Sequence, residues 1–166
     1  ATDTFNAWGY LVKYEDLINS FGSNVNAALE HYINFGYSEG RSSGDFDVYN
    51  YIASNADLID SFGSDSNLGG AHYINYGKSE GRSIDSFDEW GYLASNNDLM
   101  MVYGSNTTDA IKHYISFGKS EGRSTNIFNA DSYLNNYADL KNALGNDHTL
   151  ATKHYVENGF FEGRVY

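Results

Sequence analysis

Apolar and polar positions recur along this chain at a spacing of 41 residues. Phenylalanine, tyrosine and glycine all keep that step without a slip in register. The three series are Phe5, Phe46, Phe87 and Phe128; Tyr10, Tyr51, Tyr92 and Tyr133; and Gly22, Gly63, Gly104 and Gly145. Self-similarity at a fixed period of this length indicates a tandem repeat. We therefore predict one repeat domain, residues 1–166, made of four copies at 1–43, 44–84, 85–125 and 126–166.

The first part of each copy predicts a short helix. Its opening position holds an Asn or Asp, whose side chains cap helix N-termini well. These residues are Asn6, Asp47, Asp88 and Asn129. In the first copy Phe5 precedes the cap and Tyr10 lies four residues after it, which is the spacing of a hydrophobic staple. We expect this helix to cover residues 7–12.

A second short helix is predicted a few residues later. Asp16 stands where an N-cap would, ahead of the apolar residues within 17–21, and Gly22 follows. A glycine directly after a helix is typical of a left-handed C-cap. The pattern thus predicts a helix over 17–21 that is capped by Asp16 and closed by Gly22, either as a separate short helix or as the second part of one kinked helix.

The longest helix of each copy is predicted over residues 25–35 and their equivalents. Ala28, Tyr32 and Phe35 recur at the helical period and should share the buried face. Gly36 follows, where we expect another left-handed C-cap. The position of Ala28 holds only small residues, which predicts that another helix crosses closely there. Those residues are Ala28, Gly69, Ala110 and Ala151.

These elements predict an all-α fold, since no copy shows a β-branched run of period two. One copy is too small to bury its own apolar face, so the copies should stack into a compact solenoid or a closed four-repeat ring. The terminal copies show no obvious polar replacements, which favours closure, self-association or a longer array. In copy two, Gly69 and Gly70 lower helix propensity by about 1 kcal/mol each, so we expect that helix to start late.

The charge and composition of the chain limit the classes of partner that it can bind. The formal net charge is -12 and no run of Lys or Arg occurs, which argues against nucleic acid and anionic membranes. No segment approaches the roughly 20 apolar residues of a membrane span, so membrane insertion is not expected. The chain contains no cysteine. It opens at Ala1 without Met, as a mature secreted product or a fragment of a longer protein would.

The motif Phe-Asp/Asn…Tyr-Leu…Asp-Leu…Phe-Gly…His-Tyr…Gly…Glu-Gly-Arg resembles tandem repeats of large bacterial proteins. Such repeats accompany secreted adhesin-like proteins, exported proteases and polysaccharide-associated enzymes, as accessory modules. The likeness covers nearly every residue and implies a secreted or cell-surface location. In those relatives a Pro often precedes the residue equivalent to Asp16, whereas Glu15 stands there in this chain.

Two repeated groups carry candidate chemistry. One histidine per copy could meet its equivalents around a metal in a ring, although a His beside a core Tyr that bonds to an adjacent loop is the plainer interpretation. These are His31, His72, His113 and His154. The Glu-Gly-Arg triplet suits a structural role, with Arg forking onto a carboxylate, such as that of Asp16, or helix carbonyls of the next copy. Its charged residues are Glu39, Glu80, Glu121 and Glu162, with Arg41, Arg82, Arg123 and Arg164.

Two further groups of residues are candidate ligand sites. Residues 65–70 imitate the start of an EF-hand, but Tyr76 replaces the bidentate Glu, so calcium is at most a minor candidate and no other cofactor is implied. Trp8, Tyr49 and Trp90 occupy equivalent positions and could form an aromatic platform for sugars, or pack between copies. Asp131 breaks that series.

No phosphate loop, nucleophile elbow or paired-carboxylate signature occurs, so an enzyme is the least favoured class. We expect a non-catalytic extracellular module for protein interaction, adhesion or self-assembly. Its partner would be a protein or glycan surface, or another copy of itself. A carbohydrate-binding module is the first alternative, and a metal- or cofactor-binding protein using the four histidines is the second.

Overall fold

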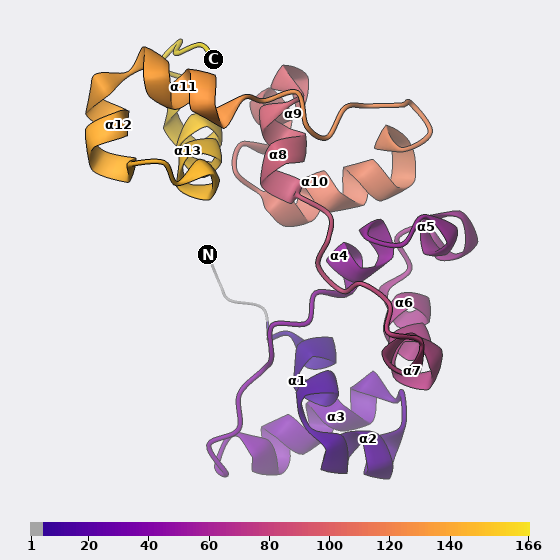
Figure 1. Cartoon of the computed structure of the whole chain (residues 1–166). Coiled ribbons are helices and arrows are strands. Elements are labelled where there is room, and N and C mark those ends of the chain that lie inside the picture. The colour runs from indigo at the N-terminus through magenta and orange to yellow at the C-terminus, as the bar shows by residue number, and fades with distance from the viewer. Residues whose placement is uncertain (1–4) are drawn as a thin grey trace. The chain divides into compact units, whose positions relative to one another are not determined.

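The computed structural model describes residues 5–166, and its regular structure is entirely helical over that range (Figure 1). The residues before Phe5, on which the expectation about the chain's opening rests, lie outside the described part. The fold divides into two compact units, the first ending at Phe87 and the second beginning at Asp88. Each unit therefore holds two copies of the repeat.

Every copy contains the same α-helices followed by a π-helical turn, and copy two has a further short helix after that turn. Copy one has α1 (Ala7–Lys13), α2 (Glu15–Phe21), α3 (Val25–His31) and a π-helical turn η1 (Tyr32–Gly36). Copy two has α4 (Val48–Ala53), α5 (Ala56–Phe62), α6 (Ser66–His72), η2 (Tyr73–Gly77) and α7 (Lys78–Glu80). Copy three has α8 (Glu89–Ala94), α9 (Asn97–Tyr103), α10 (Thr107–His113) and η3 (Tyr114–Gly118). Copy four has α11 (Ala130–Asn136), α12 (Ala138–Leu144), α13 (His148–His154) and η4 (Tyr155–Gly159).

The start of the first helix is confirmed. The Asn6 side chain accepts a hydrogen bond from the Gly9 amide at 2.8 Å, and the capping residues of the other copies do the same for their own helices. The rings of Phe5 and Tyr10 lie 5.5 Å apart, as a hydrophobic staple requires. This local arrangement fixes how the chain enters each copy.

The second helix starts earlier than predicted. It begins at Glu15, so Asp16 lies inside the first turn and is not its N-cap. The Asp16 carboxylate instead bonds to Arg41, as described below. Gly22 does end the helix with a positive φ of 57°, but its ψ of -127° places it outside the left-handed helical region. A side chain at this φ would be strained, so glycine suits the position.

In copy one the long helix ends at Gly36, as predicted, but Gly36 is not the expected left-handed C-cap, since it is absent from the glycines with positive φ. The backbone widens into a π-helical turn over Tyr32–Gly36, and Gly36 is buried within it. A Cβ on Gly36 would overlap the Tyr10 hydroxyl, so close approach explains the glycine. The positive φ occurs at Gly40, at 70°. The wider turn also leaves Phe35 57% exposed, away from the predicted buried face.

The core of each copy lies where the first helix crosses the long helix. Tyr10 and Ala28 are fully buried, as are their equivalents, and α1 packs against both α2 and α3 (Figure 1). In copy two α6 starts at Ser66, in register with the other copies, so the predicted late start is wrong. Gly69 lies against Ile52 and Gly70 against Trp8, and this packing outweighs low helix propensity.

Neighbouring copies within a unit pack through the first helix of one and the long helix of the next. In the first unit the Trp8 ring, 7% exposed, covers Gly70. In the second unit α8 lies against α13 and η4, where Val156 is fully buried. The small residue predicted at Gly69 thus packs within its own copy, whereas the contact between copies lies at the next residue, Gly70.

The first and last copies differ from this scheme in opposite ways. In copy one, Leu29 and Ile33 remain 36% and 67% exposed on the long-helix surface that Trp8 and α8 cover in copies two and four. In copy four, the first helix carries Asp131 and Asn135, both exposed, where copy three has Trp90 and the buried Ala94. The prediction that the terminal copies have no polar residues at apolar positions is therefore wrong for copy four.

Among the described residues, no helix combines the length and the apolar character needed to cross a membrane.

Candidate functional site

The repeated histidine is hydrogen-bonded in the same way in every copy. Its Nδ1 lies close to the hydroxyl of the core tyrosine 21 residues earlier in the chain. The distances are 3.0 Å for Tyr10–His31, 2.8 Å for Tyr51–His72, 2.9 Å for Tyr92–His113 and 2.9 Å for Tyr133–His154. The partner is thus a tyrosine of the first helix rather than the adjacent loop expected from the sequence.

The tyrosine hydroxyl donates in this bond when the histidine is in its Nε2–H tautomer. Burial raises the pKa of Tyr51 to about 12, with a smaller opposing effect of Arg82, so the hydroxyl stays protonated near neutral pH. A buried hydroxyl needs an acceptor, and His72 Nδ1 is in position to accept. A neutral imidazole then carries its proton on Nε2. In that tautomer one N–H donor per copy remains on the half-buried ring.

The Glu-Gly-Arg triplet forms an ion-pair network with the second helix. Arg82 Nε donates to Glu80 at 2.7 Å and Nη1 donates to Asp57 at 2.7 Å. The same pairs recur in every copy. The fork therefore closes within one copy, which corrects the prediction of a bridge to the next copy. It ties the end of each copy to the start of its own second helix.

Of the three aromatic residues predicted as a sugar platform, Trp8 is buried against Gly70 and offers no free face. Trp90 is half-buried, and the Lys153 ammonium lies 5.4 Å from its ring centroid. Tyr49 is also half-buried. Asp131, at the same position, is exposed and contacts His148 at 2.9 Å. The packing interpretation therefore holds for Trp8, while Tyr49 and Trp90 each keep part of their ring accessible.

A different set of aromatic residues, which was not predicted from the sequence, reaches the surface. In copies one to three the histidine lies between a ring from the end of the second helix and a ring from the π-helical turn. We call these sets the aromatic triplets. They are Phe21, His31 and Phe35; Phe62, His72 and Tyr76; and Tyr103, His113 and Phe117. The α-helical period predicted that Phe35 is buried, and its exposure becomes apparent only with the π-helical turn.

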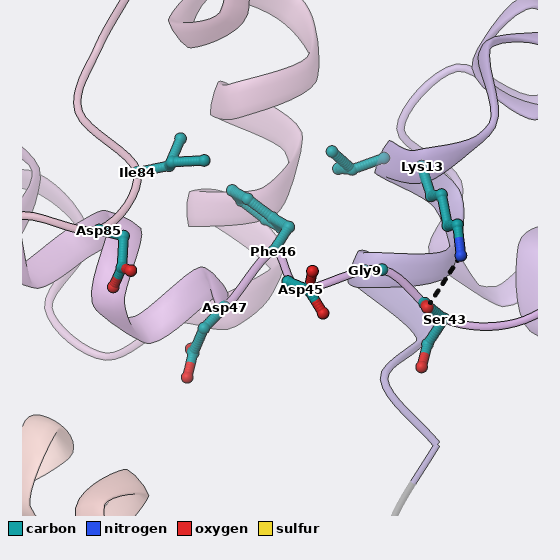
Figure 2. A pocket seen from close by; sticks show the side chains of 10 residues that line it. Gly9, Lys13, Ser43, Asp45, Phe46, Asp47, Ile84 and Asp85 are labelled. Carbon is teal, nitrogen blue, oxygen red and sulfur yellow. Dashed lines mark hydrogen bonds between the residues drawn. The ribbon is translucent and has the colours of Figure 1, made fainter. Parts of the chain in front are cut away.

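A pocket of about 410 Å³ lies in the first unit, between α1, the linker 43–47 and Ile84 with Asp85 (Figure 2). Lys13 turns toward the linker and donates to the Ser43 carbonyl at 3.4 Å (Figure 2). Phe46 supplies an apolar wall, while Asp45 and Asp85 supply carboxylates. This lining can accept a small molecule that carries hydroxyl or ammonium groups.

The segment that imitates an EF-hand is helical. Asp65 caps α6, accepting from the Asn67 and Leu68 amides at 2.9 and 3.0 Å, and the residues that follow belong to the helix. The described residues contain no group of three or more His, Cys, Asp or Glu side chains placed to hold a metal ion.

No protein-family description, no curated protein and no solved structure matches this chain.

Proposed function

We propose that this chain is a non-catalytic, extracellular repeat module that acts by self-association and protein interaction. The repeated Tyr, His, Arg and acidic groups support this, because each forms a hydrogen bond or ion pair inside its own copy. Groups with a structural partner in all four copies are poor candidates for a single active site.

The observation that carries the proposal is the difference between Ile33 and its equivalent in copy four. Ile33 is 67% exposed, whereas Val156 is fully buried where α8 packs on the long helix. Leu29 lies one turn before Ile33, so the two side chains share a face. Copy one thus presents the accepting half of the contact that joins copies elsewhere.

The fourth copy does not offer the matching half, because Asp131 and Asn135 replace apolar residues there. A closed ring, or a head-to-tail polymer, would press these polar groups on Leu29 and Ile33. We therefore propose an open array of four copies and a symmetric dimer, in which two chains pair their Leu29 and Ile33 faces.

Sedimentation across a concentration series tests this proposal. The native chain should shift from monomer to dimer as its concentration rises. Ile33→Lys should remain monomeric, because a charge would be buried at the interface. Asn34→Lys adds the same charge at the neighbouring exposed position and should still dimerise. A native chain that stays monomeric throughout, or an Ile33→Lys variant that dimerises normally, would overturn the proposal.

A further inference from the structure

The aromatic triplets expose large rings at one equivalent place in three copies. Phe35, Tyr76 and Phe117 are 57%, 58% and 57% exposed. Each ring centroid lies 5.6–5.7 Å from the centroid of its histidine. Burying such side chains would favour folding, so three exposed rings forgo much of that gain. Exposure of a ring at the same position in three copies is thus a property of the repeat, and each ring is a candidate contact for a ligand.

The fourth copy shows that the repeat folds without these rings. Leu144 and Asn158 stand at the two aromatic positions of copy four. The Tyr133–His154 hydrogen bond is nevertheless 2.9 Å long, equal to that of Tyr92–His113. The rings are therefore not needed to form the tyrosine–histidine bond, and another role has to explain them.

The chemistry of a triplet combines ring faces with one polar group. His Nδ1 is engaged by the core tyrosine, so Nε2 is the ring nitrogen left to bond a ligand, and it is a donor in the tautomer whose Nδ1 accepts from the tyrosine. A pyranose ring has an apolar C–H face that stacks on aromatic rings and hydroxyl groups that accept hydrogen bonds. A triplet supplies a partner for each of these features within one side-chain cluster.

The charge of the chain narrows the class of glycan. A net charge of -12 repels uronate and sulfate groups, so acidic polysaccharides are poor partners. We propose that the aromatic triplets bind neutral polysaccharide, one sugar ring for each triplet. The ring of Phe35, Tyr76 or Phe117 stacks on the sugar, and the histidine Nε2–H donates to a hydroxyl. Several weak sites on one chain then add their affinities along a long polymer.

Affinity electrophoresis in native gels tests this site with named polymers. The gels would contain dextran, galactomannan or xyloglucan, with heparin as the acidic comparison. We expect at least one neutral polymer to retard the native chain and heparin to leave it unaffected. The triple variant Phe35→Ala, Tyr76→Ala, Phe117→Ala should lose about tenfold or more in affinity. Its thermal midpoint should stay close to that of the native chain, because the rings are exposed.

Matched variants separate the triplets from exposed aromatic surface in general. Tyr37→Ala removes a ring that is 76% exposed and lies outside the triplets, so its retardation should equal that of the native chain. Leu144→Phe with Asn158→Phe builds a fourth triplet and should increase retardation. The site would be disproved if the native chain passed all three neutral polymers unretarded, or if the triple variant and the native chain migrated alike. Ile33 is not in a triplet, so Ile33→Lys should lose dimerisation and still be retarded by the polymer. The dimer proposal and the glycan proposal can therefore fail independently.

Discussion

The Tyr51 hydroxyl lies 2.8 Å from Nδ1 of His72 and joins the first helix of copy two to its longest helix. The tyrosine is completely buried. Gly77 leaves room for the hydroxyl, because a Cβ there would overlap it. Three residues far apart in the copy, Tyr51, His72 and Gly77, are therefore coupled through one oxygen atom.

Removing that oxygen should destabilise the fold. Tyr51→Phe leaves His72 Nδ1 without its partner, which should lower the free energy of unfolding by about 1–3 kcal/mol. Urea unfolding followed by circular dichroism measures this. Tyr37→Phe removes a hydroxyl from a ring that is 76% exposed and should have almost no effect. Equal losses in the two variants would show that the buried bond contributes nothing specific.

The same tyrosines predict a loss of stability at alkaline pH. Burial raises the pKa of both Tyr51 and Tyr133 to about 12, above the ordinary value of 10.0. Their contribution is complete below pH 10 and is lost as the pH rises toward 12, because the unfolded chain releases these protons more readily. Thermal midpoints measured from pH 9 to 12 should fall across this range. The thermal midpoint of Tyr51→Phe should fall less steeply with pH than that of the native chain. Equal slopes in the two proteins would contradict the prediction.

The contact between Trp8 and Gly70 predicts an unusual response to alanine. Alanine normally stabilises a helix by about 1 kcal/mol relative to glycine. In Gly70→Ala the new methyl would overlap the Trp8 ring, and such overpacking should destabilise the fold by about 1–3 kcal/mol. Chemical denaturation measures the net change. In a Trp8→Leu background, which removes the ring, the same substitution should become neutral or stabilising; an identical loss in both backgrounds would exclude the contact as its cause.

The sequence predicted the local features of this fold well, because they depend on residues close together in the chain. The caps at Asn6 and its equivalents and the Phe5–Tyr10 staple are of this kind. The π-helical turn was not predicted, because the helical period from Ala28 to Tyr32 gives no sign of a wider turn beyond it. Its consequences were missed with it: the buried Gly36 and the exposed Phe35.

The candidate site was harder to predict, because it depends on contacts over longer distances. The sequence made Trp8 a candidate for a sugar platform, but Gly70 of the next copy lies against its ring. Nor could spacing alone decide that Arg82 pairs with Asp57 of its own copy. Repetition showed which residues matter, while packing decided whether each one is structural or available to a ligand.

The Arg82–Asp57 pair predicts how stability responds to acid. The hydrogen bond from Arg82 holds the pKa of Asp57 below its ordinary value of 3.8. The carboxylate therefore stabilises the folded chain above about pH 4, and this contribution is lost as the pH falls through the lower, folded-state pKa. Asp57→Asn should lower the thermal midpoint at pH 7 by about 1–3 °C, a small effect because the pair is largely exposed.

Between pH 4 and 2 the thermal midpoints of the native chain and of Asp57→Asn should converge. Protonation removes the negative charge of Asp57 in the native chain, and the substitution has already removed it in the variant. Raising the salt to about 1 M should narrow the difference at pH 7 as well, because charges at the surface are then screened within about 3 Å. Asp85→Asn, which removes an exposed carboxylate from the linker after copy two, controls for the change in net charge. If the native and Asp57→Asn curves ran parallel down to pH 2, the ion pair would not be the source of the stabilisation, and the Glu-Gly-Arg triplet would need another explanation for its place in every copy.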